Sequence, residues 1–170
     1  MRQYMKKIIP FSFFALFVFT ATLIAAPQVY FSPNGGVKDR IAERIEACVD
    51  SIDVMCFEFT SRPLAKSLAD ARERGVRVRV ILDASKTEEK QSMFRFLRSK
   101  QIDVKKLSGL KQGIMHNKVA IFDSKIAFTG SYNWTTGAEH YNYENAVFLD
   151  DEQLIFEYQK EFNNLWEKAH

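Results

Sequence analysis

Apolar residues recur every three or four positions in four stretches of the chain, which predicts four amphipathic helices. The first covers residues 38–50, and the second begins at Pro63 and ends at Gly75. Proline favours the first turn of a helix, and glycine favours the position after its last residue. The third helix is predicted over 86–99 and the fourth over 151–168, with an inward face formed by Leu154, Tyr158, Phe162 and Leu165.

Short β-branched and aromatic runs lie between these stretches and predict strands. Residues 51–59 (SIDVMCFEF) are expected to form a strand buried on both faces. In VRVRVILD, Arg77 and Arg79 alternate with valines, so one face of that strand is expected to be accessible. Further strands are predicted near 102–107, at 118–123 and 125–130 as a hairpin around Asp123-Ser124, and at 144–150.

The order of these elements predicts the fold class. Strands and helices alternate first, and hairpin strands follow. This order favours an α/β fold, with a mixed sheet flanked by helices on both faces. Because the chain shows neither an internal repeat nor a low-complexity linker, we expect residues 27–170 to form a single domain.

The amino terminus has the pattern of an export signal. A basic start, MRQYMKK, precedes the apolar stretch 8–26, which ends in small residues. We expect cleavage after Ala26. The alternative is an uncleaved membrane anchor, because a bilayer span needs about 20 apolar residues. In either case the domain is expected to be exported, to the periplasm or cell envelope or into the medium.

Charge is unevenly distributed along the chain. Without residues 1–26, basic and acidic residues balance at 21 each. Residues 62–125 hold 16 Lys/Arg against 7 Asp/Glu, whereas residues 136–170 hold 2 against 8. A basic middle suits a polyanion bound on one face, although solvated helix faces produce the same pattern.

The two cysteines, Cys48 and Cys56, are expected to be small buried residues and not a disulfide pair. Cys48 closes a helical pattern, and Cys56 lies inside an apolar strand. An exported chain could form a bridge between them. Neither cysteine belongs to a Cys/His spacing typical of zinc sites.

The segment HNKVAIFD, residues 116–123, has the form H-x-K-x4-D. Residues two apart on a strand share a face, so His116 and Lys118 are expected to point the same way. An imidazole beside a fixed ammonium can attack a phosphodiester while the cation holds the phosphate oxygens. Ser131 and Asn133, also two apart, supply neutral donors on the partner strand, and Glu144 could accept a hydrogen bond from His116.

H-x-K-x4-D followed by G-S-x-N and an E-N-A-V strand resembles the phospholipase D superfamily. The similarity is greatest to its small single-motif bacterial endonucleases. The upstream YFSP and SIDVMCFEFTSRPLAKSLADARERGVRVRVILD also resemble the amino-terminal half of that family, so the likeness covers nearly the whole chain after residue 26.

The resemblance implies a role for each matching residue. His116 would be the nucleophile that forms a phosphohistidine. Lys118, Ser131 and Asn133 would bind the phosphate, and Glu144 would orient His116. Asp123 matches the motif but lies at the predicted turn with opposite parity to His116, so a structural role is expected for it.

The family uses two such motifs, with the second histidine protonating the leaving oxygen, and this chain has one. His140 lies in a polar loop without a lysine two residues on, and His170 is the last residue. A two-fold homodimer that brings both copies of His116 together would complete the site. The lysines would then supply the positive charge that a metal supplies elsewhere, so neither metal nor cofactor is expected.

Three functions follow from this reading. The first is a nuclease whose basic region 72–111 binds DNA or RNA without reading sequence. Tyr132 and Trp134 would stack on unpaired bases, or pack in the core or at the dimer interface. The second is a phospholipase acting on an anionic lipid such as cardiolipin, which should show an exposed apolar patch or loop near the site. The third is a non-catalytic DNA-binding protein of DNA uptake.

Overall fold

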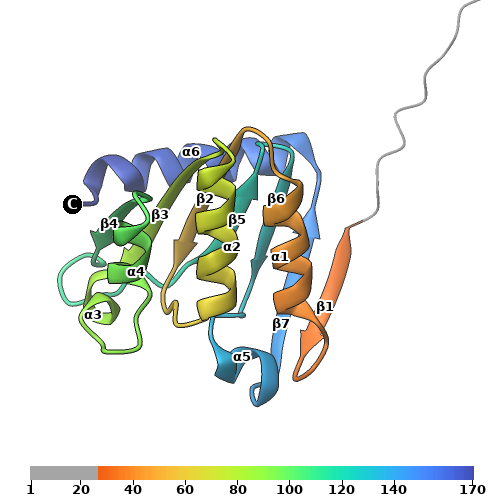
Figure 1. Ribbon diagram of the computed structural model, residues 1–170, viewed down its shortest axis with the longest axis horizontal. Coiled ribbons are helices and arrows are strands. Elements are labelled where there is room, and N and C mark those ends of the chain that lie inside the picture. Colours follow the sequence, from red (N-terminus) through yellow and green to blue (C-terminus); the bar gives the residue numbers. More distant parts are fainter. Residues whose placement is uncertain (1–26) are drawn as a thin grey trace, which may run out of the picture.

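The computed structural model describes residues 27–170, and the predicted signal segment lies outside them. One sheet passes through the described part of the chain, in the order β1-β7-β6-β5-β2-β3-β4 (Figure 1). Its strands are β1 (Gln28–Ser32), β2 (Ser51–Cys56), β3 (Arg77–Asp83), β4 (Asp103–Leu107), β5 (Lys118–Phe122), β6 (Ile126–Gly130) and β7 (Glu144–Leu149).

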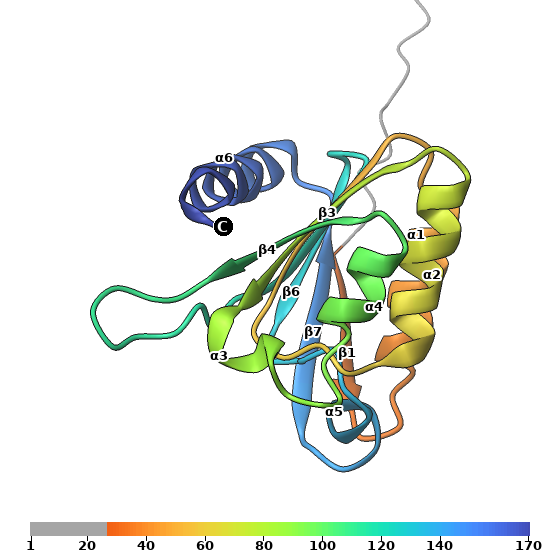
Figure 2. The ribbon, with the colours of Figure 1, turned by 60° about the vertical axis from the view of Figure 1, so that its left-hand side comes forward.

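Helices cover both faces of this sheet. Figure 2 shows the long carboxy-terminal helix on one face and other helices on the opposite face. The first layer consists of α1 (Val37–Ala47), α2 (Arg62–Glu73) and α4 (Phe94–Ser99), and the opposite layer is α6 (Glu152–Lys168). Two short helices, α3 (Ala84–Thr87) and α5 (Thr136–His140), lie near one edge of the sheet (Figure 1).

The strand pairing is mixed, which confirms the predicted fold class. β2 runs parallel to β3, and β3 runs parallel to β4. β5 is antiparallel to both β2 and β6, and β7 is antiparallel to both β6 and β1. Parallel pairs need helical crossovers, which α2 and α3–α4 provide, whereas β5 and β6 need only a tight turn.

Apolar side chains form a core on each side of the sheet. One core lies between the sheet and α1, α2 and α4, and includes Ile41, Leu68 and Leu97. The other lies beneath α6 and includes Ile155 and Phe162. Every residue of β2 is buried, as expected for a central strand covered on both faces.

A buried ion pair fixes α6 to the sheet. The carboxylate of Asp53 is 1% exposed and accepts two hydrogen bonds from Arg79, at 2.8 and 2.7 Å, and one from Gln159 of α6 at 2.7 Å. The Arg79 guanidinium also lies 4.7 Å from the ring centroid of Phe162. The face of β3 that was expected to be accessible is therefore largely occupied at Arg79, although Arg77 stays exposed.

Four further predictions about single elements were incomplete or wrong. The predicted helix 86–99 is divided into α3 and α4, because the chain turns between them and the Met93 amide donates to the carbonyl of Phe59 at 2.9 Å. The strand predicted over 51–59 ends at Cys56. On α6, Leu154 is 50% exposed, since the inward face is centred on Ile155 and Phe162. Neither β1 nor α5 was predicted.

Candidate active site

The predicted site residues other than Asp123 lie at one edge of the sheet, the lower edge in Figure 1. β2, β3 and β6 end at this edge, and β5 and β7 begin there. His116 lies just before β5, and Lys118 is its first residue. Ser131 follows β6, and Glu144 begins β7. The antiparallel pairing of β5, β6 and β7 therefore brings together residues that lie up to 28 positions apart in the sequence.

Hydrogen bonds hold the backbone on both sides of His116. The Met115 amide donates to the buried carboxylate of Asp83 at 2.7 Å. The Asn117 carbonyl accepts from the Phe57 amide at 3.0 Å. These two contacts tie the segment to the ends of β3 and β2, so the exposed imidazole of His116 projects from a fixed backbone.

The ring of Phe57 packs against the predicted nucleophile and its lysine. The Phe57 and His116 ring centroids are 4.7 Å apart, with an interplanar angle of 61°. The ammonium of Lys118 lies 5.0 Å from the Phe57 centroid and donates to the His116 carbonyl at 2.9 Å. Lys118 is 6% exposed, and burial lowers its pKa from the ordinary lysine value.

The side chains of Ser131 and Glu144 form a hydrogen bond where β6 ends and β7 begins. The Ser131 hydroxyl donates to one carboxylate oxygen of Glu144, and the Asn142 side chain donates to the other at 3.0 Å. The backbone amide of Ser131 donates to the Asn145 side chain at 2.8 Å. Within residues 27–170, these contacts occupy the Glu144 carboxylate, and it makes no hydrogen bond to His116.

Asn133 lies near this group but points partly inward. Its side chain is half-buried, and its Oδ1 has no hydrogen-bond partner among the described residues. A buried amide oxygen without a partner is uncommon in folded proteins. The structure thus leaves one polar atom of a predicted phosphate-binding residue unpaired.

The prediction that Tyr132 and Trp134 stack on bases is wrong. Tyr132 is 1% exposed and Trp134 is 0% exposed. The Tyr132 hydroxyl donates to the buried carboxylate of Glu139 at 2.7 Å, and the Trp134 ring packs edge-on against Phe59. Both side chains belong to the core, the alternative that was predicted alongside stacking.

Asp123 lies at the other end of β5 from His116. The two residues are seven positions apart along extended chain, a distance of about 20 Å. Its carboxylate accepts from the backbone amides of Val49, Asp50 and Ser51, at 3.1, 2.8 and 2.9 Å. Burial acts to raise the pKa of Asp123, but these donors outweigh it and leave that pKa lowered. The acid of the motif therefore holds the α1–β2 connection, and it does not reach the other site residues.

The remaining histidines contact residues outside the motif, whereas Cys56 pairs in register with Lys118. His140 ends α5 and its Nδ1 is 3.0 Å from the Asn34 side chain, and the backbone of His170 pairs with Lys106. Cys48 and Cys56 are both buried and free, as predicted. Burial raises the pKa of each thiol to about 12, so both remain protonated at neutral pH.

Three residues of this region were not predicted from the sequence. Phe57 contacts His116, Asp83 holds the amide before it, and Lys86 of α3 places its ammonium 5.4 Å from the Phe57 centroid. Asp83 ends a buried strand at the edge where ligand-binding residues gather in α/β folds, which is a signal that could have identified it. No comparable signal marks Phe57 or Lys86.

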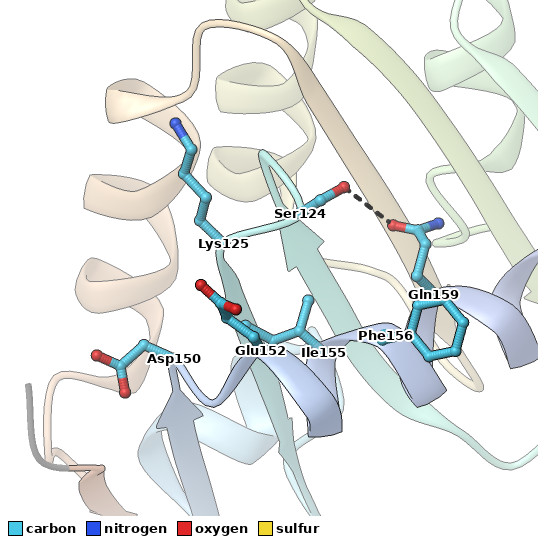
Figure 3. Close-up of a pocket in the computed structure, with 7 residues that line it drawn as sticks. All are labelled: Ser124, Lys125, Asp150, Glu152, Ile155, Phe156 and Gln159. Carbon is cyan, nitrogen blue, oxygen red and sulfur yellow. Dashed lines mark hydrogen bonds between the residues drawn. The ribbon is translucent and has the colours of Figure 1, made fainter. Parts of the chain in front are cut away.

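Among the hollows that adjoin α6, two lie at opposite ends of β5, and one of these is lined by His116. It has a volume of about 530 Å³ and lies between the segment 107–117 and α6, with Ile114, Met115 and Leu165 in its lining. The second hollow, about 500 Å³, lies near the β5–β6 turn, at the end of β5 opposite His116 (Figure 3). Asp150 and Glu152 line it together with a single lysine, Lys125, which is a poor environment for a phosphate.

Two features are absent from residues 27–170. No group of three or more His, Cys, Asp or Glu side chains is arranged to hold a metal ion there. In the same part of the chain, no helix has both the length and the apolar character needed to span a bilayer.

Sequence comparison places the chain among phospholipase D-like proteins. Residues 41–166 match the family described as cardiolipin synthase, PLD-like domain. The chain is 34% identical over 134 residues to a phospholipase D of Rickettsia conorii, covering 79% of this chain and 66% of that protein. It is 33% identical over 158 residues to a mitochondrial cardiolipin hydrolase of Mus musculus, covering 88% and 71%.

Solved structures agree with this assignment. NucT from Helicobacter pylori is 28% identical and superposes with a TM-score of 0.82, covering 85% of this chain and 97% of NucT. The phospholipase D family member Nuc from Salmonella typhimurium is also 28% identical, with a TM-score of 0.79, and covers 85% and 96%. The family match spans most of the chain and the two structures match over nearly their whole length, so this chain belongs to the phospholipase D superfamily, as its motif predicted.

Proposed function

We propose that this superfamily hydrolase is an exported, metal-independent phosphodiesterase that cleaves nucleic acid, with an active site shared by two copies of the chain. The observation that carries the proposal is the exposed imidazole of His116, fixed beside the Lys118 ammonium at one sheet edge. The likeness to Nuc and NucT over nearly their entire length supports the nuclease reading.

The reaction follows from one imidazole and the donors around it. A nitrogen of His116 attacks phosphorus, forming a P–N bond as the P–O bond to the leaving group breaks. The leaving oxygen takes a proton from the partner subunit's His116, acting as general acid. Water then attacks phosphorus, the P–N bond breaks, and the second imidazole takes the proton of that water. The products are a phosphate monoester and an alcohol.

Lys118 and Ser131 are the groups that would bind the phosphate oxygens. An ammonium that is 6% exposed loses little strength to solvent screening, so it can offset the charge that develops on phosphorus-bound oxygen. The Ser131 hydroxyl donates a hydrogen bond to Glu144 in this structure, and it can donate to a phosphate oxygen of the substrate instead. Glu144 would then be free to accept from His116, the orienting role expected of it.

An exposed apolar face of β1 beside the site supports the proposed dimer. α6 packs across β2, β4, β5 and β6. On β1, Tyr30 packs onto Phe148 in the core beneath α1, so Val29 and Phe31 face the opposite side and remain 52% and 64% exposed. Phe31 pairs in register with Asn145, which is bonded to Ser131. A two-fold contact on this face would bury both side chains close to the two sites.

The dimer is tested by light scattering on residues 27–170. Phe31→Glu is expected to reduce the mass from dimer to monomer and to abolish cleavage. Val49→Glu is the matched control. Val49 is 79% exposed, and it lies in the α1–β2 connection, at the strand ends opposite the site. A wild-type protein that is fully active as a monomer would contradict the shared site.

The nuclease proposal is tested by digestion of single- and double-stranded DNA in EDTA. Wild type is expected to cleave, and His116→Ala is expected to be inactive. DNA bound without turnover by either protein would favour the non-catalytic uptake function. Cleavage that requires added metal would contradict the mechanism.

A second candidate, hydrolysis of an anionic phospholipid, is favoured by the hollow that contains His116. Leu110 is 93% exposed and Ile114 is 48% exposed in the segment that borders it. Relatives named phospholipase D and cardiolipin hydrolase are 34% and 33% identical to this chain over the aligned residues. Hydrolysis of cardiolipin vesicles but not of phosphatidylcholine control vesicles, by an enzyme that leaves DNA intact, would identify the protein as a phospholipase and not a nuclease.

A further inference from the structure

The Phe57 ring brings a second lysine to the active site. Phe57 follows β2, and three groups from two other segments surround its ring. The His116 ring centroid is 4.7 Å from it, the Lys118 ammonium 5.0 Å, and the Lys86 ammonium 5.4 Å. Because both ammonium groups lie close to the same centroid, they are no more than about 10 Å apart.

This upper limit admits two neighbouring phosphates of one strand, one at each lysine. Each strand of a duplex carries one negative charge per about 3.4 Å of helix axis, so successive phosphates fit within the interval between the two lysines. Lys118 adjoins His116 and is placed to bind the phosphate that is attacked. Lys86 lies farther along the same edge, on α3, where the next phosphate would pass.

Lys86 keeps donor capacity for a ligand. Its ammonium donates to Glu89 at 2.7 Å, and its side chain is 28% exposed. A lysine ammonium has three donors, so two remain after this bond. The hydrogen bond to Glu89 raises the pKa of Lys86, which keeps the ammonium charged at neutral pH.

Several acidic groups surround Lys86. Glu58, Asp83 and Glu89 all act on its charge. Asp83 is already occupied by hydrogen bonds from Ser85 and from the Met115 amide, and Glu89 also accepts from Gln91. Glu58 remains, and it acts on Lys118 as well. The three carboxylates outnumber the two lysines, so Lys86 would hold a phosphate by direct contact of its ammonium and not through a net positive field.

We propose that Lys86 binds the phosphate adjacent to the scissile one, so that the enzyme grips two successive phosphodiesters. This inference rests on the proposed nuclease function and defines how the substrate is held. It assigns Lys86 to substrate binding and leaves the attack itself to His116 and Lys118.

The test compares Lys86→Gln with Lys90→Gln, an exposed lysine of the turn that follows α3, on trinucleotides. One trinucleotide has two phosphodiesters. The others carry a neutral methylphosphonate in place of one or the other linkage, so that the remaining phosphodiester has an uncharged neighbour. For one of these two substrates, wild type and Lys90→Gln are expected to lose roughly tenfold in kcat/KM, the effect of one charge-assisted hydrogen bond.

Lys86→Gln is expected to show the same loss on the fully charged trinucleotide and less than about twofold further loss on the methylphosphonate. Such non-additivity is the signature of two groups in contact. With a longer single-stranded oligonucleotide, the slope of log KM against log salt should fall by about 0.7 in this variant.

Two outcomes separate the inference from the function on which it rests. If wild type cleaves the trinucleotides and Lys86→Gln responds to the methylphosphonate as fully as wild type does, Lys86 does not bind the adjacent phosphate, and the nuclease function stands. If wild type cleaves no nucleic acid, the proposed function and this inference fail together.

Discussion

The imidazole of His116 meets the ring of Phe57 edge-on, with centroids 4.7 Å apart and an interplanar angle of 61°. An edge-to-face aromatic pair contributes about 0.5–1.5 kcal/mol beyond the area that it buries. The Phe57 amide also donates a hydrogen bond to the carbonyl of Asn117, the residue that follows His116. The end of β2 thus fixes both the main chain and the ring of the predicted nucleophile.

Removal of this ring should slow the chemical step. Phe57→Leu leaves His116 without its aromatic neighbour, and a misplaced nucleophile loses rate more than binding. We expect kcat to fall roughly tenfold with KM nearly unchanged. Phe57→Tyr keeps the ring and should retain activity. An equal loss in both variants, or a change confined to KM, would show that the contact does not orient His116.

Asp83 should act on catalysis through the amide of Met115. Its carboxylate caps α3 through Ser85 and accepts from Met115 at 2.7 Å, next to His116. Asn offers one acceptor oxygen where Asp offers two, so Asp83→Asn should weaken one of these contacts and destabilise the fold by about 1–2 kcal/mol. In addition, kcat per folded molecule should fall roughly tenfold.

Asp151→Asn is the matched control for Asp83→Asn. Asp151 also caps a helix, accepting from the Leu154 amide at 2.8 Å at the start of α6, and it lies away from His116. A comparable loss of melting temperature with unchanged kcat is expected. If the two variants lose kcat in equal proportion to their loss of stability, Asp83 has only a structural role.

Asp123 should contribute to stability in a pH-dependent way. Its pKa is lowered in the folded protein by three backbone donors. Its contribution is therefore fully present above the unfolded pKa of about 3.9 and is lost as pH falls through the folded value. Asp123→Ala should reduce the free energy of unfolding by about 1 kcal/mol at pH 7, and by less at pH 3.

Urea unfolding at both pH values measures this difference. Activity per folded molecule should be unaffected at pH 7, since β5 separates Asp123 from His116. A large loss of kcat at full folding would assign Asp123 to catalysis after all.

Lys118 should set the alkaline limit of activity. Burial lowers its pKa, so the ammonium loses its proton at a pH below the ordinary lysine value of 10.5. The ratio kcat/KM should decline as pH rises through the lowered value, because the neutral amine no longer stabilises phosphate charge. In Lys118→Arg, residual activity should show no such decline, since arginine stays charged. An unchanged alkaline limb in that variant would assign the limb to another group.

The sequence predicted those parts of the site that depend on neighbours in the chain. The two-residue spacing of His116 and Lys118 and the hairpin between β5 and β6 follow from strand periodicity. The same periodicity could have corrected one error. Ser131 and Asn133 were assigned to the site, so Tyr132 and Trp134, with opposite parity, should have been assigned to the core.

Contacts between distant segments could not be predicted in this way. Phe57 precedes His116 by about 60 residues, and their contact depends on the pairing of β2 with β5 at Cys56 and Lys118. Lys86 reaches the same ring from α3, which follows β3, the parallel neighbour of β2. Hydropathy carries no information about either relationship, because both are set by strand order.

The most direct test of the central claim is to trap the phosphohistidine. Wild type is mixed with a DNA oligonucleotide in EDTA, denatured at alkaline pH within one turnover, and digested with trypsin. Cleavage after Lys111 and Lys118 releases the peptide 112–118, whose only histidine is His116. We predict that this peptide gains the mass of the phosphorylated fragment and that His116→Ala shows neither adduct nor cleavage. Cleavage by wild type without this adduct, or by His116→Ala, would contradict the account.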